Sequence, residues 1–108
     1  MRAVVGIRTS RQPLRGNRNG PVPTVWFDSW RQLAGVLSDE NRQLLRIIRD
    51  RHPRTVAELA EFSGRAASNL SRTLRTFERY RLVTLHRSTE SRAVRPEAMA
   101  TEFTVMLD

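Results

Sequence analysis

The stretch from Thr55 to Leu85 constrains this chain more than any other, because two helical patterns follow each other there with a short turn between them. Thr55 precedes an apolar stripe, and Glu58 stands three residues later, which is the pattern of a capping box at the start of a helix. Gly64 is expected to end that helix, since glycine adopts the left-handed conformation that closes a helix C-terminus. A second, longer helix is predicted from about residue 66 to residue 80.

The second predicted helix separates into two faces when its residues are placed ~100° apart. One face is apolar and is expected to pack on the core; it holds Ala66, Ala67, Leu70, Leu74 and Phe77. The other face carries arginine, hydroxyl and amide side chains and no acid. It holds Ser68, Asn69, Arg72, Arg75, Thr76 and Arg79, with Ser71 on its flank. A face that is only solvated usually mixes acids with bases.

Two helices joined by a glycine-containing turn, with a basic outer face on the second, form the arrangement of a helix-turn-helix, whose second helix enters the major groove of DNA. The alternative is a helical hairpin with an arginine-rich solvated face. On the first interpretation, Ser68, Asn69, Arg72, Arg75 and Thr76 contact bases, with Ser71 beside them. Phosphate contacts are expected from Arg65, Arg79, Arg87, Arg92 and Arg95.

The segment ASNLSRTLRTFERYRLV resembles the recognition helix and exit of winged-helix regulators of the MarR and ArsR type. The matching places are Ser71-Arg72, Leu74, Phe77-Glu78 and Leu82-Val83, within a resemblance that spans roughly residues 38–95. Arg81 stands where that family usually has glycine, which predicts a less sharp end of the helix. The resemblance implies a winged helix-turn-helix with its recognition helix at about 66–80 and its wing at about 83–95.

The order of segments in the whole chain resembles a small group of prokaryotic winged-helix regulators encoded beside small toxins. Phe27-Asp28-Ser29-Trp30 and the terminal strand carry this resemblance. It implies an antitoxin that binds a cognate toxin and autorepresses its operon, as the alternative to a plain transcriptional regulator and repressor. Either protein is expected to bind double-stranded DNA as a homodimer.

The remaining segments predict a mainly α protein with a small β component (α+β), that is, a winged helix-turn-helix with extra N- and C-terminal strands. Residues 1–24 are expected to form a strand and a basic arm, although the arm could equally be a solvated linker. Residues 25–95 are expected to form the winged helix-turn-helix, and residues 96–108 a terminal strand for dimer or partner contact. That strand follows Pro96, which is expected to interrupt the wing, and could pair with the N-terminal run or with another chain.

Helix starts and inward positions are also predicted before the central motif. Asp28 or Ser29 is expected to cap a helix over about 30–37, with Leu33, Ala34 and Leu37 inward. Ser38 is expected to cap the next helix, which buries Leu44, Leu45, Ile47 and Ile48. The aromatic side chains of Trp26, Phe27 and Trp30 are interpreted as core or interface anchors rather than as a ligand site.

The charge distribution favours a nucleic-acid partner. The net charge is +8, and the excess arginine lies in residues 1–27 and 65–95, whereas residues 96–108 are acidic. Two concentrated basic regions predict salt-dependent binding to phosphates. A basic RNA- or ribosome-associated protein is a third interpretation, although the chain lacks the surface aromatics of RNA-stacking modules.

The same composition argues against catalysis and metal binding. The chain has no cysteine, and its histidines, His52 and His86, lack metal-ligand spacing. No nucleophile–base pair or phosphate loop is present, so neither an enzyme nor a cofactor is expected. Without a membrane-length apolar run or a signal sequence, the chain is expected to be cytoplasmic and to have no membrane partner.

Overall fold

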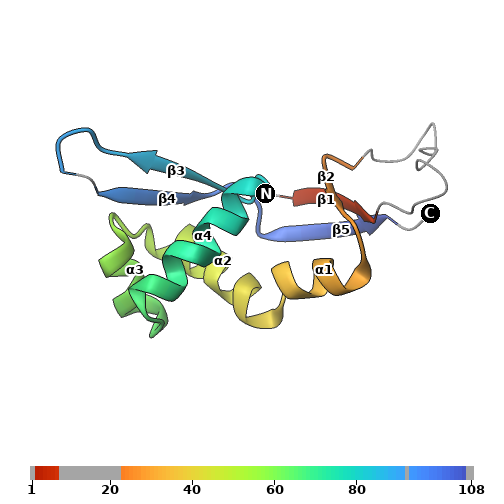
Figure 1. Ribbon diagram of the computed structural model, residues 1–108, viewed down its shortest axis with the longest axis horizontal. Coiled ribbons are helices and arrows are strands. Elements are labelled where there is room, and N and C mark those ends of the chain that lie inside the picture. Colours follow the sequence, from red (N-terminus) through yellow and green to blue (C-terminus); the bar gives the residue numbers. More distant parts are fainter. Residues whose placement is uncertain (1, 8–22, 92, 107–108) are drawn as a thin grey trace.

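The computed structural model describes residues 2–7, 23–91 and 93–106, and this part of the chain is an α+β fold with four helices and two small sheets. A two-stranded hairpin stands at one end of the long axis and a three-stranded sheet at the other, with the helices between and below them (Figure 1). The predicted α+β class is confirmed. In chain order the elements are β1 (Arg2–Ile7), β2 (Val25–Phe27), α1 (Trp30–Val36), α2 (Asp39–Arg51), α3 (Val56–Ser63), α4 (Ala67–Arg79), β3 (Val83–Arg87), β4 (Val94–Ala98) and β5 (Glu102–Met106).

Three helices begin at hydroxyl caps that the sequence predicted. Ser29, Ser38 and Thr55 precede α1, α2 and α3, and each side chain accepts a hydrogen bond from the backbone N–H three residues on. The capping box of α3 differs in one detail, because Glu58 Oε1 accepts from the N–H of Arg54, at 3.0 Å, rather than from that of Thr55. Gly64 ends α3 with φ 75°, as predicted.

The end of α4 is sharper than its sequence suggested. Arg81 adopts the left-handed conformation, with φ 60°. The N–H of Leu82 donates to the carbonyl of Phe77, at 2.8 Å, and the N–H of Arg81 donates to that of Glu78, at 3.0 Å. These two bonds form a complete Schellman motif, in which the residue with positive φ is usually glycine. The expectation of a loose helix end at Arg81 is therefore wrong.

The three-stranded sheet has the order β2-β1-β5, and both pairings are parallel. The terminal strand thus pairs with the N-terminal run of the same chain, which was one of its two predicted partners. The strand β2 was not predicted, because Trp26 and Phe27 were interpreted only as aromatic anchors. Neighbouring residues in register share a face, so Val5 lies beside Val25 and Val105 on the side that the helices cover.

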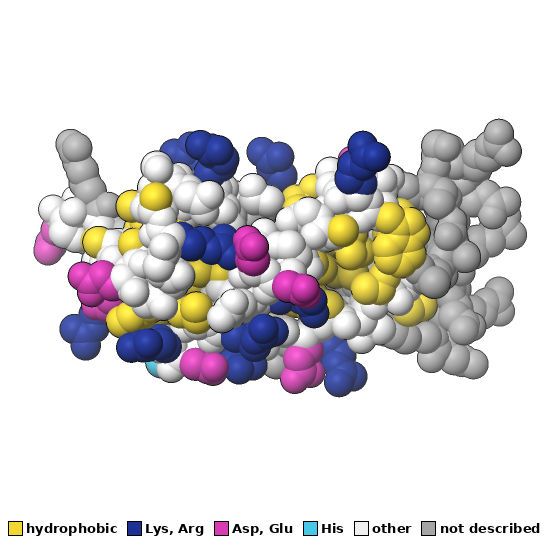
Figure 2. All heavy atoms as spheres, turned by 90° about the horizontal axis from the view of Figure 1, so that it is seen from below, with side chains coloured by type: hydrophobic (Ala, Val, Ile, Leu, Met, Phe, Trp, Pro, Cys, Tyr) yellow, Lys and Arg dark blue, Asp and Glu magenta, His cyan; other side chains and the backbone are white. Residues whose placement is uncertain are grey.

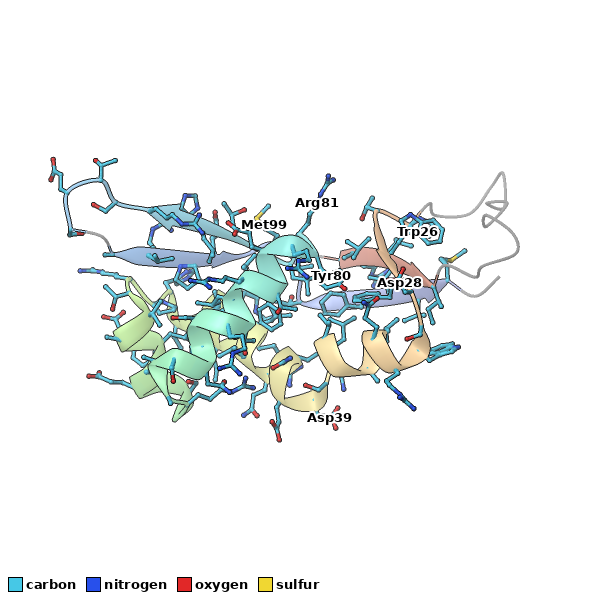
Figure 3. The ribbon with its side chains drawn as sticks, in the orientation of Figure 1. Trp26, Asp28, Asp39, Tyr80, Arg81 and Met99 are labelled. Atoms are coloured by element: carbon cyan, nitrogen blue, oxygen red, sulfur yellow. The ribbon has the colours of Figure 1, made fainter. Side chains whose placement is uncertain are left out.

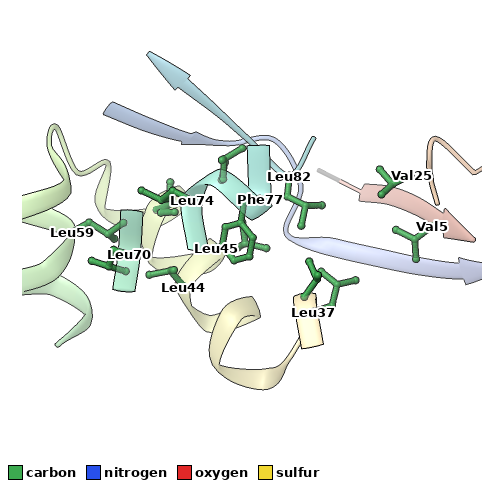
Figure 4. Packing of buried hydrophobic residues seen from close by; sticks show 14 of the residues in the cluster. Val5, Val25, Leu37, Leu44, Leu45, Leu59, Leu70, Leu74, Phe77 and Leu82 are labelled. Carbon is green, nitrogen blue, oxygen red and sulfur yellow. The ribbon is translucent and has the colours of Figure 1, made fainter. Parts of the chain in front are cut away.

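One hydrophobic core joins the sheet to the helices (Figure 4). Val5 and Val25 reach from the sheet toward Leu37, the residue that follows α1, while Leu59 and Leu70 meet between α3 and α4. The other fully buried large side chains include Phe27, Leu44, Leu45, Ile48, Leu74, Phe77 and Leu82. Phe27 is a core anchor, as expected, and its ring stacks on Tyr80 with the centroids 4.6 Å apart.

Three alanines and one tryptophan lie outside the core. Ala66 and Ala67, predicted to be inward, are exposed, because they stand at the first turn of α4, beyond the helices that cover its later residues. Ala34 is exposed as well, and Val36 is buried on α1 beside the predicted Leu37. Trp30 is 56% exposed and therefore does not anchor the core.

The hairpin begins as predicted and continues further. β3 lies within the wing predicted at about 83–95, but β4 runs from Val94 to Ala98, beyond that wing, and contains Pro96, opposite Leu85. Pro96 was expected to interrupt this strand. A proline is tolerated here because β3 is the only partner of β4 among the described strands, so the missing N–H removes no bond of a second ladder.

Candidate nucleic-acid interface

The polar face of α4 lies opposite its buried face, as the sequence predicted. Leu70, Leu74 and Phe77 are buried against the other helices. Six residues of the opposite side are exposed: Ser68, Asn69, Ser71, Arg72, Arg75 and Arg79. The arginines recur at intervals of three and four residues, so their side chains follow one stripe along the helix. We call these six residues the α4 outer face.

Most arginines of the described residues have no acid partner, and those of the α4 outer face are the ones that follow one another along a single helix. Within the described residues, Arg72, Arg75 and Arg79 form no ion pair. Four arginines elsewhere do pair with acids: Arg2 with Glu102, Arg42 with Asp39, Arg49 with Asp50, and Arg87 with Glu78. The helical underside of the molecule accordingly mixes both signs of charge (Figure 2). The α4 outer face is therefore a basic surface without local neutralisation.

Thr76 is less available than its predicted neighbours on α4. Its side chain is half-buried, and its hydroxyl donates to the carbonyl of Arg72, at 3.3 Å. A threonine hydroxyl in a helix commonly makes this bond to the preceding turn. Thr76 lies at the edge of the polar face, and its hydroxyl proton is already used.

The first turn of α4 is open. Ala66, in the N-cap position, makes no side-chain cap, so the first N–H groups of the helix gain no acceptor from that residue. These groups carry the positive end of the helix dipole, which favours an anion nearby. The exposed methyl groups of Ala66 and Ala67 add little bulk at this end of the helix.

Arg65 is held by a residue that the sequence analysis did not single out. Its Nη1 donates to Asn41 Oδ1, at 3.1 Å. The amide nitrogen of Asn41 donates in turn to the carbonyls of Gly35 and Val36, at 3.3 and 3.1 Å. This chain of bonds ties the turn before α4 to the junction of α1 and α2. Asn41 lies 24 residues from Arg65, and no local sequence pattern indicates the contact.

The predicted wing arginines do not share one face of the hairpin. Arg87 lies on the side that faces the helices, and its guanidinium nitrogens donate to the two carboxylate oxygens of Glu78 on α4, at 3.3 and 3.4 Å. Arg95 is opposite His86 and lies on the other side, since cross-strand partners share a face. Arg92 lies outside the described residues. Arg87 therefore ties the hairpin to α4, which the analysis of the sequence missed.

A second hydrogen bond links the two strands of the hairpin on its outer side. His86 Nε2 and Glu97 Oε1 are 2.9 Å apart. This bond, with the charges of His86 and Arg95, lowers the pKa of the Glu97 carboxyl, against a smaller opposing effect of desolvation. In the same way, the hydrogen bond from Arg49 lowers the pKa of Asp50 on α2.

The described residues contain no group of three or more His, Asp or Glu side chains that could hold a metal ion. In the same part of the chain, no helix is long and apolar enough to cross a membrane.

Comparison with known proteins identifies a family from the chain's own sequence. The model of the HVO_A0114 family matches residues 36–105, which is well over half of the chain and covers α2 to α4, the hairpin and most of β5. No curated protein and no solved structure shows a significant match.

Proposed function

The chain belongs to the HVO_A0114 family, and we propose that it is a sequence-specific DNA-binding transcriptional regulator of the winged helix-turn-helix type, acting as a repressor. In this proposal α3 and α4 form the helix-turn-helix, and β3 and β4 form the wing. α4 enters the major groove with its outer face toward the bases, while the hairpin lies along the backbone. The resemblance to MarR- and ArsR-type regulators is part of the same proposal.

The observation that carries this proposal is the α4 outer face. Three arginines without an acid partner, two hydroxyls and an amide project from one side of a helix whose other side buries Leu70, Leu74 and Phe77. These neighbouring unpaired arginines do not stabilise the fold, because like charges on one helix face repel each other. A polyanion that presents base-edge acceptors would satisfy both the guanidinium and the amide groups.

The proposed contacts are of two kinds, with DNA bases and with phosphates. Arg72 and Arg75 are proposed to read guanine, and Asn69 to read adenine, because their side chains offer bidentate donors or a donor–acceptor pair. The methyl group of Ala67 is added as a contact to thymine, since it is exposed beside Ser68 at the start of α4. Arg79, further along the helix, is assigned to phosphate.

The hairpin and the turn are given a positioning role. Arg65 and Arg87 each already bind a protein group, Asn41 and Glu78. They are therefore proposed to hold the turn and the wing against α4, and to add phosphate contacts only at the edge of the complex. Arg95, on the outer side of the hairpin, remains a candidate phosphate contact.

The test is binding to the DNA upstream of the chain's own gene, over a salt series, with unrelated DNA of equal length as competitor. A specific regulator is expected to prefer the upstream fragment by ~10³-fold or more, with log affinity falling linearly as log salt rises. Equal affinity for both fragments, or a preference for RNA, would contradict the proposal.

Variants then test the face assignment. Arg72→Ala and Arg75→Ala should each weaken binding by about 1–3 kcal/mol and relax preference at one base, whereas Arg79→Ala should mainly reduce the salt slope by about one. Arg31→Ala is the matched control, because Arg31 is an exposed arginine on α1. If Arg72→Ala and Arg75→Ala bind like Arg31→Ala, the outer face of α4 does not read DNA.

A further inference from the structure

The apolar face of the three-stranded sheet is incompletely covered at β5. Val5, on the central strand, is 0% exposed, and its register partner Val105 on β5 is 37% exposed although it lies on the same face. Val25, in register on the other edge strand, is only 6% exposed, so the helices cover this face at β2 and β1 but incompletely at β5. Hydrophobic side chains also gather at this end of the molecule, which carries α1 and the sheet (Figure 2). Within the described residues, the apolar face is therefore left partly uncovered at β5.

A groove runs beside β5, between the strand and the helices. It has a volume of about 270 Å³ and is lined by Leu33, Leu37, Arg42, Arg46, Phe103 and Val105, among others. The outer edge of β5 has no partner strand within the described residues, so its outward backbone N–H and C=O groups can pair with an added strand.

We propose that the occupant of this edge is β5 of a second copy of the chain, added antiparallel across a two-fold axis at Thr104. The two three-stranded sheets would become one six-stranded sheet, with the helices of both copies on the same side. A two-fold axis perpendicular to the sheet pairs only residues whose side chains lie on the same face. Because alternate residues of a strand share a face, the axis must pass beside one residue of β5 and not midway between two.

The residues of β5 complement themselves in this register. Centring the pair on Thr104 places Phe103 opposite Val105 of the second copy, Thr104 opposite Thr104, and Glu102 opposite Met106. Aromatic–β-branched and Thr–Thr pairs are among the favourable cross-strand pairs. No like charges oppose each other. Phe103 and Val105 of both copies would form a continuous apolar surface over the two grooves.

The other edge of the sheet is a poorer site for a second copy. β2 has only three residues, whereas β5 has five, and a short strand offers fewer ladder bonds. A heterologous partner needs its own complementary strand, while the second copy already supplies one in the sequence of β5. The inference rests on the sheet and does not depend on DNA binding.

The oligomeric state without DNA tests the interface. The wild-type chain is expected to be a dimer in sedimentation equilibrium. Val105→Arg should raise the dimer dissociation constant by roughly 100-fold or more, because each dimer would bury two unpaired guanidinium groups. Met99→Arg is the matched control: Met99 is 46% exposed, lies beside Arg81 on the upper side of the molecule (Figure 3), and should leave the dimer intact.

A single cysteine tests the register, since the chain has no cysteine of its own. Directly opposite residues of antiparallel strands have Cα atoms about 4.5 or 5.5 Å apart, and both distances fall within the range that a disulfide spans. Thr104→Cys should therefore form a covalent dimer on mild oxidation. Thr84→Cys is the control, because Thr84 is an exposed residue of β3, and this variant should stay monomeric on a denaturing gel.

The outcomes separate clearly. A dimer that is lost in Val105→Arg and cross-linked in Thr104→Cys supports the proposal. A monomeric wild-type chain overturns it, and capture of a neighbouring gene product such as a toxin would then give the edge a different occupant. A dimer unaffected by Val105→Arg, or without cross-linking at Thr104, also overturns it. If Val105→Arg fails to fold by circular dichroism, the cysteine experiment decides alone. DNA binding is measured separately, so either proposal can fail without the other.

Discussion

Replacing Arg81 by glycine should stabilise the protein. Arg81 is exposed and carries φ 60° at the end of α4 (Figure 3). Its side chain points away from the helices, so removing it costs little packing. The backbone bonds of the Schellman motif, from Leu82 and Arg81 to Phe77 and Glu78, do not involve the side chain and are retained. The substitution therefore changes the conformational energy of one residue and one surface charge.

The magnitude follows from two opposing effects. A residue with a Cβ atom loses about 1–2 kcal/mol in the left-handed region, and glycine does not. Glycine also has more conformational freedom in the unfolded chain, and this lowers the gain in stability by about 0.4–1 kcal/mol. The net gain in the free energy of unfolding is about 0.5–1 kcal/mol. For a chain of this size that corresponds to a rise in Tm of about 2–5 °C.

Urea and thermal unfolding of three variants check this reasoning. Arg81→Ala removes the same charge but keeps the Cβ atom, so it should be less stable than Arg81→Gly by about 0.5–1 kcal/mol. Arg75→Gly, in the right-handed interior of α4, should have the opposite sign and lose about 1 kcal/mol. If Arg81→Gly is no more stable than Arg81→Ala, the left-handed conformation of residue 81 is not a source of strain.

Two further predictions concern the sheet and the hairpin. Gly6→Ala should lower the free energy of unfolding in urea by about 1–3 kcal/mol, because the new Cβ would lie 2.8 Å from Trp26 Cζ3. Gly35→Ala is the control and should stabilise α1, because a Cβ at Gly35 would have nothing within 4 Å. Equal effects of the two substitutions would refute the packing argument. Glu97 has a lowered pKa, so its bond to His86 stabilises the fold above the ordinary glutamate pKa of about 4.3 and the stability is lost as pH falls through the lower native value. Glu97→Gln should therefore be less stable at neutral pH and equal to the wild type in acid, and a stability difference that persists in acid would contradict this assignment.

Local sequence patterns predicted only part of the candidate site. Periodicity placed Ser68, Arg72, Arg75 and Arg79 on one side of a helix, because side-chain direction along a helix depends only on sequence spacing. The same periodicity misplaced Ala67, since whether a helical residue is buried depends on which neighbours extend that far. The two bonds that hold the turn and the hairpin, Arg65–Asn41 and Arg87–Glu78, join different elements and have no signal in sequence spacing.

The strands were likewise predictable only in part from the sequence. Alternation predicted β5 but left its partner open, since ladder bonds join backbone groups of any sequence. Pro96 was expected to end a strand, and it is tolerated in β4 because the hairpin has no third strand among the described residues.

By itself, the sequence determined the helices, their hydroxyl caps, the glycine at the end of α3 and the basic face of α4. These features arise from interactions within a few residues, so local chemistry is sufficient to specify them. Only the tertiary structure decided that β1 pairs with β2 and β5, that Glu78 holds Arg87, that Arg81 completes a glycine-type helix end, and that β5 is an edge strand of the described sheet. Each of these depends on contacts between distant residues, whose free energy appears only once the core has brought them together.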